Sequence, residues 1–130
     1  MLVDDTPYNL FALQCFLHLL KISADEAVNG EEAVNKILEK NKKDSGESYK
    51  LILMDINMPI MDGIQASNIV KEKIATGVID FVPLIALSGE NKTEEEKRAF
   101  CKNTGFSEYM TKPITRDEFI KLLVRYNIIF

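Results

Sequence analysis

The sequence is poor in the residue types that zinc sites and Ser-His-Asp catalysis require. It has one histidine, His18, and two cysteines, Cys15 and Cys101, so neither kind of site has much to be built from. The cysteines lie far apart in helical patterns and form no C-x-x-C pair. We therefore expect reduced thiols that pack as small apolar groups in a cytosolic compartment. His18 falls in the first predicted helix and is expected to be structural or surface-exposed.

Long apolar runs and clusters of basic residues are also missing. No segment approaches the roughly 20 apolar residues of a membrane-spanning helix, and no signal-peptide pattern opens the chain. The formal net charge of −4 and the lack of a basic block argue against a nucleic-acid partner. The 130 residues are 46% hydrophobic and 28% charged, which is typical of a single globular domain. We expect a cytoplasmic domain, residues 1–130, without direct membrane contact.

Short apolar segments alternate with amphipathic ones along the chain. Leu51 to Met54 are four large apolar residues in a row, as in a strand that is buried on both faces of a parallel sheet. Strands are predicted over residues 1–4, 22–28, 51–55, 82–87 and 106–111. Helices are predicted from residue 7 onward and over 31–40, 63–76, 93–103 and 115–126, with a loop over 41–48. This alternation predicts an α/β fold in which helices cover both faces of a parallel sheet.

Helix starts carry recognisable capping residues. Thr6 is expected to cap the first helix, with Pro7 at the first helical position. Two further threonines precede a glutamate by three residues, which predicts capping boxes. These pairs are Thr93 with Glu96 and Thr115 with Glu118.

Polar residues stand where the apolar strands end. Asp55 directly follows the run at 51–54, and Pro59 separates it from any helix that it could cap. Corresponding positions are held by Asp4 and Asp5 after the first strand, Ser88 after the fourth and Lys112 after the fifth. Because parallel strands share one direction, we expect these side chains at one edge of the sheet, where open α/β sheets bind ligands.

Such a group of residues suits metal-assisted phosphoryl transfer. Neighbouring carboxylates repel one another, and a hard divalent cation compensates for this. Magnesium takes one or two protein carboxylates and leaves other positions to water and phosphate oxygens. Asp55 could then attack a phosphoryl group and form an aspartyl phosphate. The ion, Lys112 and Ser88 would stabilise charge on the phosphoryl oxygens.

Over essentially its full length, the sequence resembles the receiver domain of two-component response regulators. The similar stretches are VDDTPYN, VNGEEAV, LILMDINMPIMDG, PLIALSG and EYMTKPI. Single motifs such as DD or KP are weak, whereas all five in this order and at suitable spacing are specific. The pattern DxxMPxMDG together with DDTPYN is most similar to receivers attached to hybrid histidine kinases in phosphorelays.

The resemblance implies a flavodoxin-like (βα)5 three-layer sandwich with strand order 2-1-3-4-5. It implies that Asp55 is the phosphorylated residue and that Mg²⁺ is the cofactor. Asp5 would be a direct magnesium ligand and Asp4 would act mainly through water. Asn57 would bind the metal through its backbone carbonyl.

The resemblance also implies how the phosphoryl group is held and reported. Lys112 would pair with it and Ser88 would hydrogen-bond to it. Tyr109 would be an aromatic switch that rotates inward when Ser88 moves, changing the face formed by residues 93–103, 106–111 and 115–126. The sequence departs from the family at two places. Gly89 replaces the usual alanine, which is expected to loosen the loop after Ser88. The first strand is also short.

The implied partner is a histidine kinase or a histidine phosphotransfer protein. The phosphoryl group would be released slowly by self-hydrolysis, without further enzymatic activity. We expect a monomer or weak dimer that is cut from a larger protein, such as the cytosolic part of a membrane-bound sensor kinase.

Alternative interpretations remain for the function of the chain and for single residues. A haloacid-dehalogenase-like phosphatase would need a second acid at the position of Asn57, and a flavin-binding flavodoxin would need a phosphate loop where the acidic DDTPYN stands. A degenerate receiver would lack the acids or the lysine. Asp4 and Asp5 could simply form a turn that caps the first helix, Ser88 could be a loop serine, and Tyr109 an ordinary strand aromatic.

Overall fold

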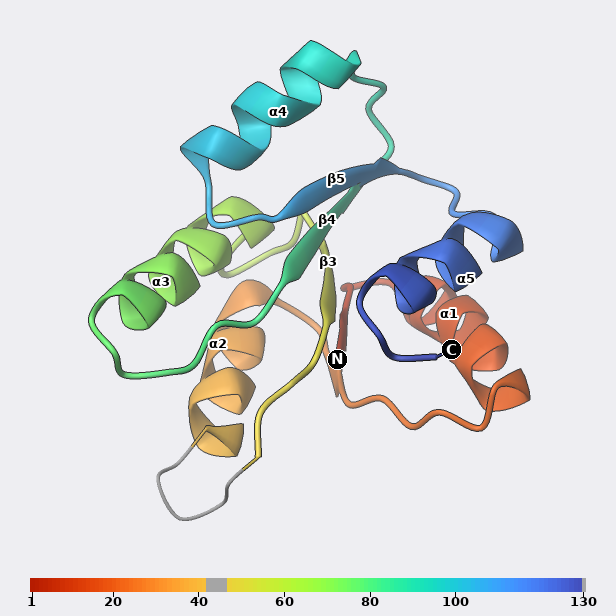
Figure 1. Ribbon diagram of the computed structural model, residues 1–130, viewed down its shortest axis with the longest axis horizontal. Helices are drawn as coiled ribbons and strands as arrows, with labels where there is room; N and C mark the ends of the chain where they lie inside the picture. Colours follow the sequence, from red (N-terminus) through yellow and green to blue (C-terminus); the bar gives the residue numbers. More distant parts are fainter. Residues whose placement is uncertain (42–46, 130) are drawn as a thin grey trace.

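A parallel sheet forms the middle layer of the fold (Figure 1). The computed structural model describes residues 1–41 and 47–129. Within these residues, five strands pair in parallel in the order β2-β1-β3-β4-β5, as predicted. The strands are β1 (Leu2–Val3), β2 (Glu26–Ala27), β3 (Ile52–Asp55), β4 (Leu84–Ser88) and β5 (Glu108–Thr111).

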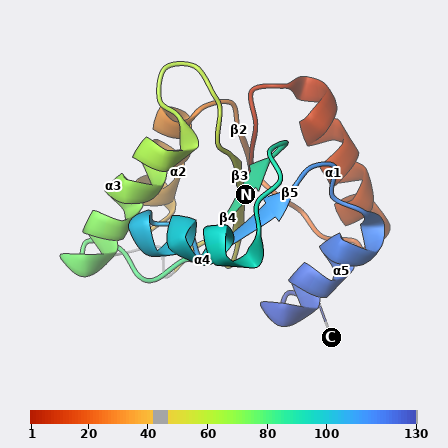
Figure 2. The ribbon, with the colours of Figure 1, turned by 90° about the horizontal axis from the view of Figure 1, so that it is seen from above.

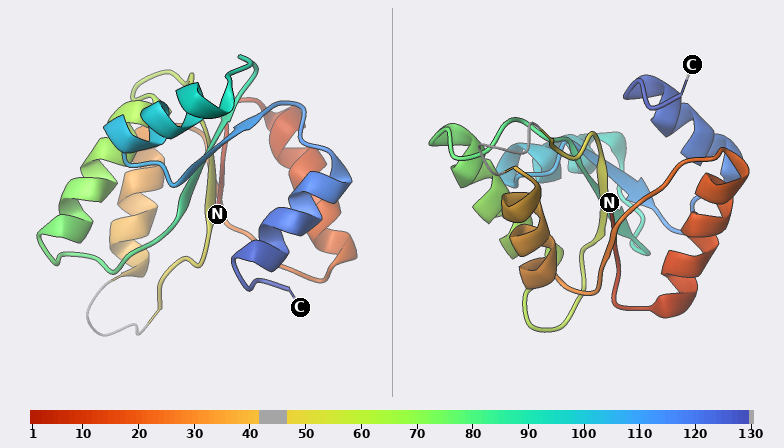
Figure 3. Two further views of the ribbon diagram at one scale, coloured as in Figure 1. Left: turned by 45° about the horizontal axis from the view of Figure 1, so that its top comes forward. Right: turned by 90° about the horizontal axis from the view of Figure 1, so that it is seen from below.

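Helices cover both faces of this sheet (Figures 2 and 3). They are α1 (Pro7–Leu19), α2 (Gly30–Lys40), α3 (Gly63–Ala75), α4 (Glu94–Asn103) and α5 (Arg116–Arg125). Figure 3 shows α1 and α5 on one side of the sheet and α2 and α3 on the other. None of the helices in the described ranges is long and apolar enough to cross a membrane.

The strands separate two hydrophobic cores. Successive strand residues point to opposite faces of a sheet. In β3, Ile52 and Met54 therefore pack with residues of α2 and α3, while Leu53 packs with residues of α1 and α5. Since both faces of β3 are buried, each position of the apolar run 51–54 needs an apolar side chain.

Some predicted strands are longer than the observed ones. The strand predicted over 22–28 is observed only as β2, residues 26–27. Within the described residues this edge strand pairs with β1 alone, and β1 is itself only two residues long. The strand predicted over 106–111 begins at Glu108. Although β1 is short, both of its residues are buried, and it pairs with β2 and β3 on its two sides. Most of the predicted loop, residues 42–46, lies outside the described residues.

Of the three predicted helix caps, one is found in full and one in part. Thr93 and Glu96 form the complete capping box, whereas Thr115 only accepts a hydrogen bond from the Glu118 backbone N–H. Thr6 occupies the cap position of α1, but its side chain makes no capping hydrogen bond within the described part of the chain. Two residues earlier, Asp4 Oδ1 accepts a hydrogen bond from the Thr6 backbone N–H at 2.9 Å, which fixes the turn before α1.

The caps of α2 and α3 were not predicted. Asn29 caps α2 by accepting a hydrogen bond from the Glu32 backbone N–H, and Asp62 forms a capping box with Gln65 at the start of α3. Asparagine and aspartate are among the preferred capping residues, so both caps have a signal in the sequence.

The cysteines differ in their surroundings. Both are free thiols, as predicted. Cys101 is partly buried against one core, but Cys15 is exposed, so the expectation that both pack as small apolar groups was wrong for Cys15. Cys15 lies on the outer face of α1 together with the exposed Phe11 and His18. An apolar helix such as α1 has more apolar residues than one buried face can hold.

Candidate functional site

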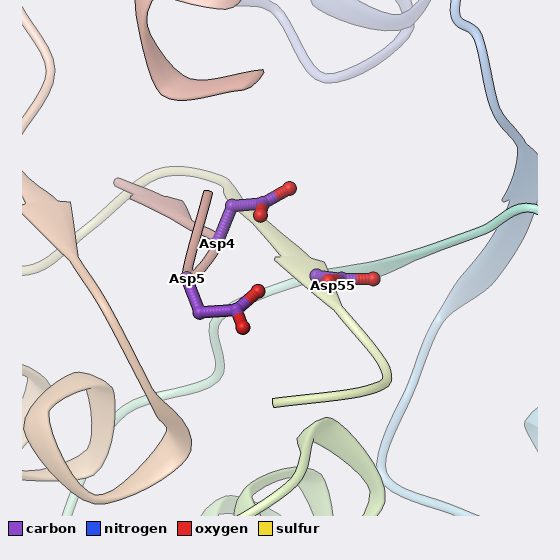
Figure 4. A group of neighbouring side chains, drawn as sticks. All are labelled: Asp4, Asp5 and Asp55. Carbon is purple, nitrogen blue, oxygen red and sulfur yellow. The ribbon is translucent and has the colours of Figure 1, made fainter. Parts of the chain in front are cut away.

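Three carboxylates meet at the carboxyl edge of the sheet. Asp4 and Asp5 follow β1, and Asp55 ends the neighbouring strand β3, whose residue Met54 lies beside Val3. One carboxylate oxygen of each aspartate lies within 4.8 Å of the others. Figure 4 shows the three side chains side by side at this edge. Asp4 and Asp55 are buried, whereas Asp5 is exposed to solvent.

Asp4 is held by several hydrogen bonds. Its Oδ1 accepts from the Thr6 backbone N–H, and its Oδ2 accepts from Asn9 Nδ2 and from Lys112 Nζ, each at 3.1 Å. Asp4 therefore forms a turn before α1, but its carboxylate is buried and also belongs to the acidic cluster. Asn9 was not singled out from the sequence. It lies in the first turns of α1, five residues after Asp4.

Lys112 connects two of the acids. Its Nζ lies 3.1 Å from Asp4 Oδ2 and 3.1 Å from Asp55 Oδ1. The backbone N–H of Lys112 also donates to the Ser88 carbonyl at 2.7 Å, which joins the end of β5 to the end of β4. A cis peptide bond links Lys112 to Pro113. The five predicted strand-end residues, Asp4, Asp5, Asp55, Ser88 and Lys112, thus come together at one edge of the sheet.

The pKa values of Asp55 and Lys112 are both raised, but by different causes. Burial raises the pKa of the Asp55 carboxyl, and the charges of Asp4 and Asp5 raise it further, while Lys112 opposes the shift. Burial would lower the pKa of Lys112, but its hydrogen bond to Asp4 and the charges of Asp55 and Asp4 outweigh burial and raise it. Burial is thus the main cause of the shift at Asp55, and the neighbouring acids are the cause at Lys112.

This arrangement fits a hard divalent cation. Three carboxylates share one ammonium group in the cluster, so negative charge remains uncompensated. The available ligand atoms are oxygens, which Mg²⁺ prefers, and the exposure of Asp5 leaves room for the water molecules that Mg²⁺ retains. Asn57 lies two residues beyond Asp55 in the loop after β3, and its side chain is exposed. The cluster can therefore hold Mg²⁺.

Ser88 ends β4 beside these residues and is buried. Its Oγ accepts a hydrogen bond from the Glu90 backbone N–H at 3.2 Å. The hydroxyl proton is not used in this bond, so it can be donated to an oxygen of a ligand at Asp55.

Tyr109 already lies inward in this structure. It is 5% exposed, its hydroxyl donates to the Glu90 backbone carbonyl, and its ring meets that of Phe100 edge-on, with the centroids 5.2 Å apart. The inward position that the resemblance assigns to the phosphorylated state is thus occupied here. Its physical basis is the hydrogen bond to Glu90 together with the contact with Phe100. The part played by Glu90 is a backbone contact, for which the sequence holds no signal.

The chain matches a known family. Residues 1–124 match the model of the response regulator receiver domain. The chain is 35% identical over 127 residues to Two-component response regulator 24 of Arabidopsis thaliana, which is 98% of this chain and 82% of that protein. It is 30% identical over 127 residues to Hybrid signal transduction histidine kinase L of Dictyostelium discoideum. That match covers 98% of this chain but 7% of the kinase, so the chain spans a small part of this relative.

Solved structures lead to the same family. The receiver domain of a sensor histidine kinase from Pseudomonas aeruginosa PAO1, with a magnesium ion coordinated in its active site cleft, superposes with a TM-score of 0.74. It is 29% identical, and the match covers 96% of this chain and 93% of that one. A chain in the co-crystal structure of the Saccharomyces cerevisiae histidine phosphotransfer protein Ypd1 and the receiver domain of Ssk1 gives a TM-score of 0.79. It is 30% identical, with 98% of this chain and 86% of that one covered. The chain belongs to the response regulator receiver domain family, whose members are signalling phosphoacceptors.

Proposed function

We propose that Asp55 takes a phosphoryl group from a phosphohistidine of a histidine kinase or histidine phosphotransfer protein. The observation that supports this most directly is the position of the Asp55 carboxylate, which lies in the acidic cluster and 3.1 Å from the Lys112 ammonium. In the proposed step an Asp55 oxygen attacks phosphorus, a P–O bond forms and the P–N bond breaks. The imidazole of the partner is the leaving group.

Each neighbouring residue has a distinct part in this proposal. Lys112 fixes Asp55 Oδ1 before the reaction and then neutralises charge on the phosphoryl oxygens. Ser88 donates its hydroxyl proton to one of them. Asp5, Asp4, Asp55 and the backbone carbonyl of Asn57 would hold Mg²⁺, which supplies positive charge to the phosphoryl oxygens when bound.

The proposed chemistry ends with hydrolysis of the aspartyl phosphate by water, which returns the Asp55 carboxylate. No other reaction is proposed for the domain. The hybrid-kinase relative and the structure with Ypd1 support a place in a phosphorelay. The chain covers only 7% of that kinase, so a role in a phosphorelay is proposed for this domain and not inferred from the activity of the whole kinase.

The test uses acetyl phosphate as a small-molecule donor. With Mg²⁺ present, the intact mass of the wild type should rise by one phosphoryl group, whereas Asp55→Asn should remain unlabelled. Asp80→Asn is the matched control, because Asp80 is an exposed acid outside the cluster, and it should be labelled like the wild type. Labelling of Asp55→Asn, or wild-type labelling that persists in excess chelator, would refute the assignment. Transfer from a purified phosphorylated histidine phosphotransfer protein would then test the partner class.

A further inference from the structure

Lys92 lies over two aromatic rings beside the phosphorylation site. Its Nζ is 5.6 Å from the ring centroid of Tyr109 and 5.9 Å from that of Phe100. Both distances fall within the range of a cation–π interaction. The side chain is 21% exposed, so it lies against the protein along most of its length. Its distance of 3.9 Å from the Glu90 carboxylate adds little, because that carboxylate is 75% exposed.

The Tyr109 ring beneath Lys92 connects to Ser88 through the backbone of one residue, Glu90. The Tyr109 hydroxyl donates to the Glu90 carbonyl, and the Glu90 backbone N–H donates to Ser88 Oγ. The Glu90 residue is therefore held at both its N–H and its C=O. Since this N–H occupies an acceptor site of the Ser88 hydroxyl, it determines in which directions the hydroxyl proton can point.

The helix that follows Lys92 is weakly held near this residue. None of the ten residues of α4, all of which lie in the described part of the chain, is buried. Its C-terminal end is anchored, because the Gly105 backbone N–H beyond it donates to Ser67 Oγ of α3 at 3.1 Å. At its N-terminal end the capping box joins Thr93 only to Glu96 of the same helix. Next to this end, the Lys92 side chain lies over the Tyr109 ring of β5, and further along α4 the Phe100 ring contacts the same ring.

We propose that Lys92 is a positioning residue of the phosphorylation site, acting through Tyr109 and Glu90 on the hydroxyl of Ser88. The cation holds the Tyr109 ring inward, the Tyr109 hydroxyl holds the Glu90 carbonyl, and the Glu90 N–H orients Ser88. This rests on the proposed function of Asp55 but concerns the arrangement of the domain before phosphorylation. In this arrangement Lys92, which directly precedes the exposed N-terminal end of α4, acts on Ser88 through Tyr109 and Glu90.

The test compares Lys92→Met with Lys92→Arg in the unmodified protein, without phosphodonor. Methionine keeps the length of the side chain but removes the charge, while arginine keeps the charge over the rings. Loss of the two contacts should lower the ratio of inward to outward Tyr109 about two- to fivefold. This is measured by NMR of tyrosine rings, with Tyr109→Phe for assignment. Hydrogen exchange of the Glu90 amide should accelerate by a similar factor.

Two variants keep the outcome interpretable. Lys92→Arg should restore wild-type values, and Lys97→Met should have no effect, because Lys97, on α4, pairs with Glu94 instead of a ring. The proposal is overturned if Lys92→Met leaves Tyr109 and the Glu90 amide unchanged, if Lys92→Arg behaves like methionine, or if amides throughout α5 accelerate equally. Because no phosphorylation is involved, these results stand apart from labelling of Asp55.

Discussion

The loop after β3 contains a backbone conformation that should be strained. Ile60 has φ = +70°, and the backbone N–H of Met61 donates to the carbonyl of Pro59 at 2.8 Å across it. A three-residue turn of this kind is rare, and a positive φ is especially unfavourable for a β-branched residue. Lys21 and Asn127 also have positive φ, but they directly follow the caps of α1 and α5, where a left-handed residue is common. We therefore predict that Ile60→Gly stabilises the protein.

The magnitude follows from three contributions. Relief of the left-handed conformation should gain about 1–2 kcal/mol. Glycine loses more conformational freedom on folding, which costs about 0.5–1 kcal/mol. Little apolar burial is lost, because Ile60 is 77% exposed. The net expectation is a gain of about 0.5–1 kcal/mol in the free energy of unfolding, to which the strain relief contributes most.

The measurement is urea unfolding, followed by circular dichroism at constant pH and without Mg²⁺. The midpoint should rise while the denaturant slope stays the same. Val78→Gly is the matched control, because Val78 is also an exposed β-branched loop residue, at 55%, but does not have a positive φ. This control should lose about 0.5–1 kcal/mol. If Ile60→Gly were destabilised as much as Val78→Gly, the turn would hold no strain and the reasoning would be wrong.

Three further predictions concern the metal, the packing and the pH dependence. Mg²⁺ should raise the melting temperature of the wild type, and Asp5→Asn should reduce this rise; an equal response in both proteins contradicts the proposed ligand. Gly105→Ala should cost about 1–3 kcal/mol in urea unfolding, because its Cβ would lie 1.9 Å from the Ser67 carbonyl oxygen, whereas Gly89→Ala meets nothing within 4 Å and should be tolerated. Burial raises the pKa of Asp55, so the folded state holds this proton more tightly than the unfolded chain, and the resulting stability is lost as pH rises through the folded pKa. Without Mg²⁺, the stability of the wild type relative to Asp55→Asn should therefore fall from acidic to neutral pH, and a constant difference would count against this shift.

The order of strands and helices followed from the sequence because the signals are local and repeated. Apolar runs such as 51–54 and capping pairs such as Thr93 with Glu96 act over a few residues. Their alternation leaves few topologies for one parallel sheet. The lengths of the strands could not be predicted in the same way. The length of β2 depends on its neighbour β1, which is far away in the sequence, and Ile22 has the same apolar character inside a strand or outside it.

The site was predictable at the level of side chains and not at the level of backbone contacts. Asp55, Ser88 and Lys112 stand at strand ends, and the shared direction of the strands is enough to bring them together. The two hydrogen bonds of the Glu90 backbone and the left-handed conformation of Ile60 involve main-chain atoms that every residue carries. Such contacts depend on the exact course of a loop, for which composition and spacing give no signal.

Asp4 and Asp5 are adjacent acids with very different surroundings, and this decides which of them tests the metal site. Asp4 is 2% exposed and accepts hydrogen bonds from Thr6, Asn9 and Lys112. Its replacement removes the hydrogen bonds that hold the turn before α1 and leaves Lys112 with one partner fewer, so loss of metal binding in an Asp4 variant would have several causes. Asp5 is exposed, and its contribution to the cluster is its charge. A change in the magnesium response of Asp5→Asn, with the fold intact in the absence of the ion, therefore reports on the metal itself.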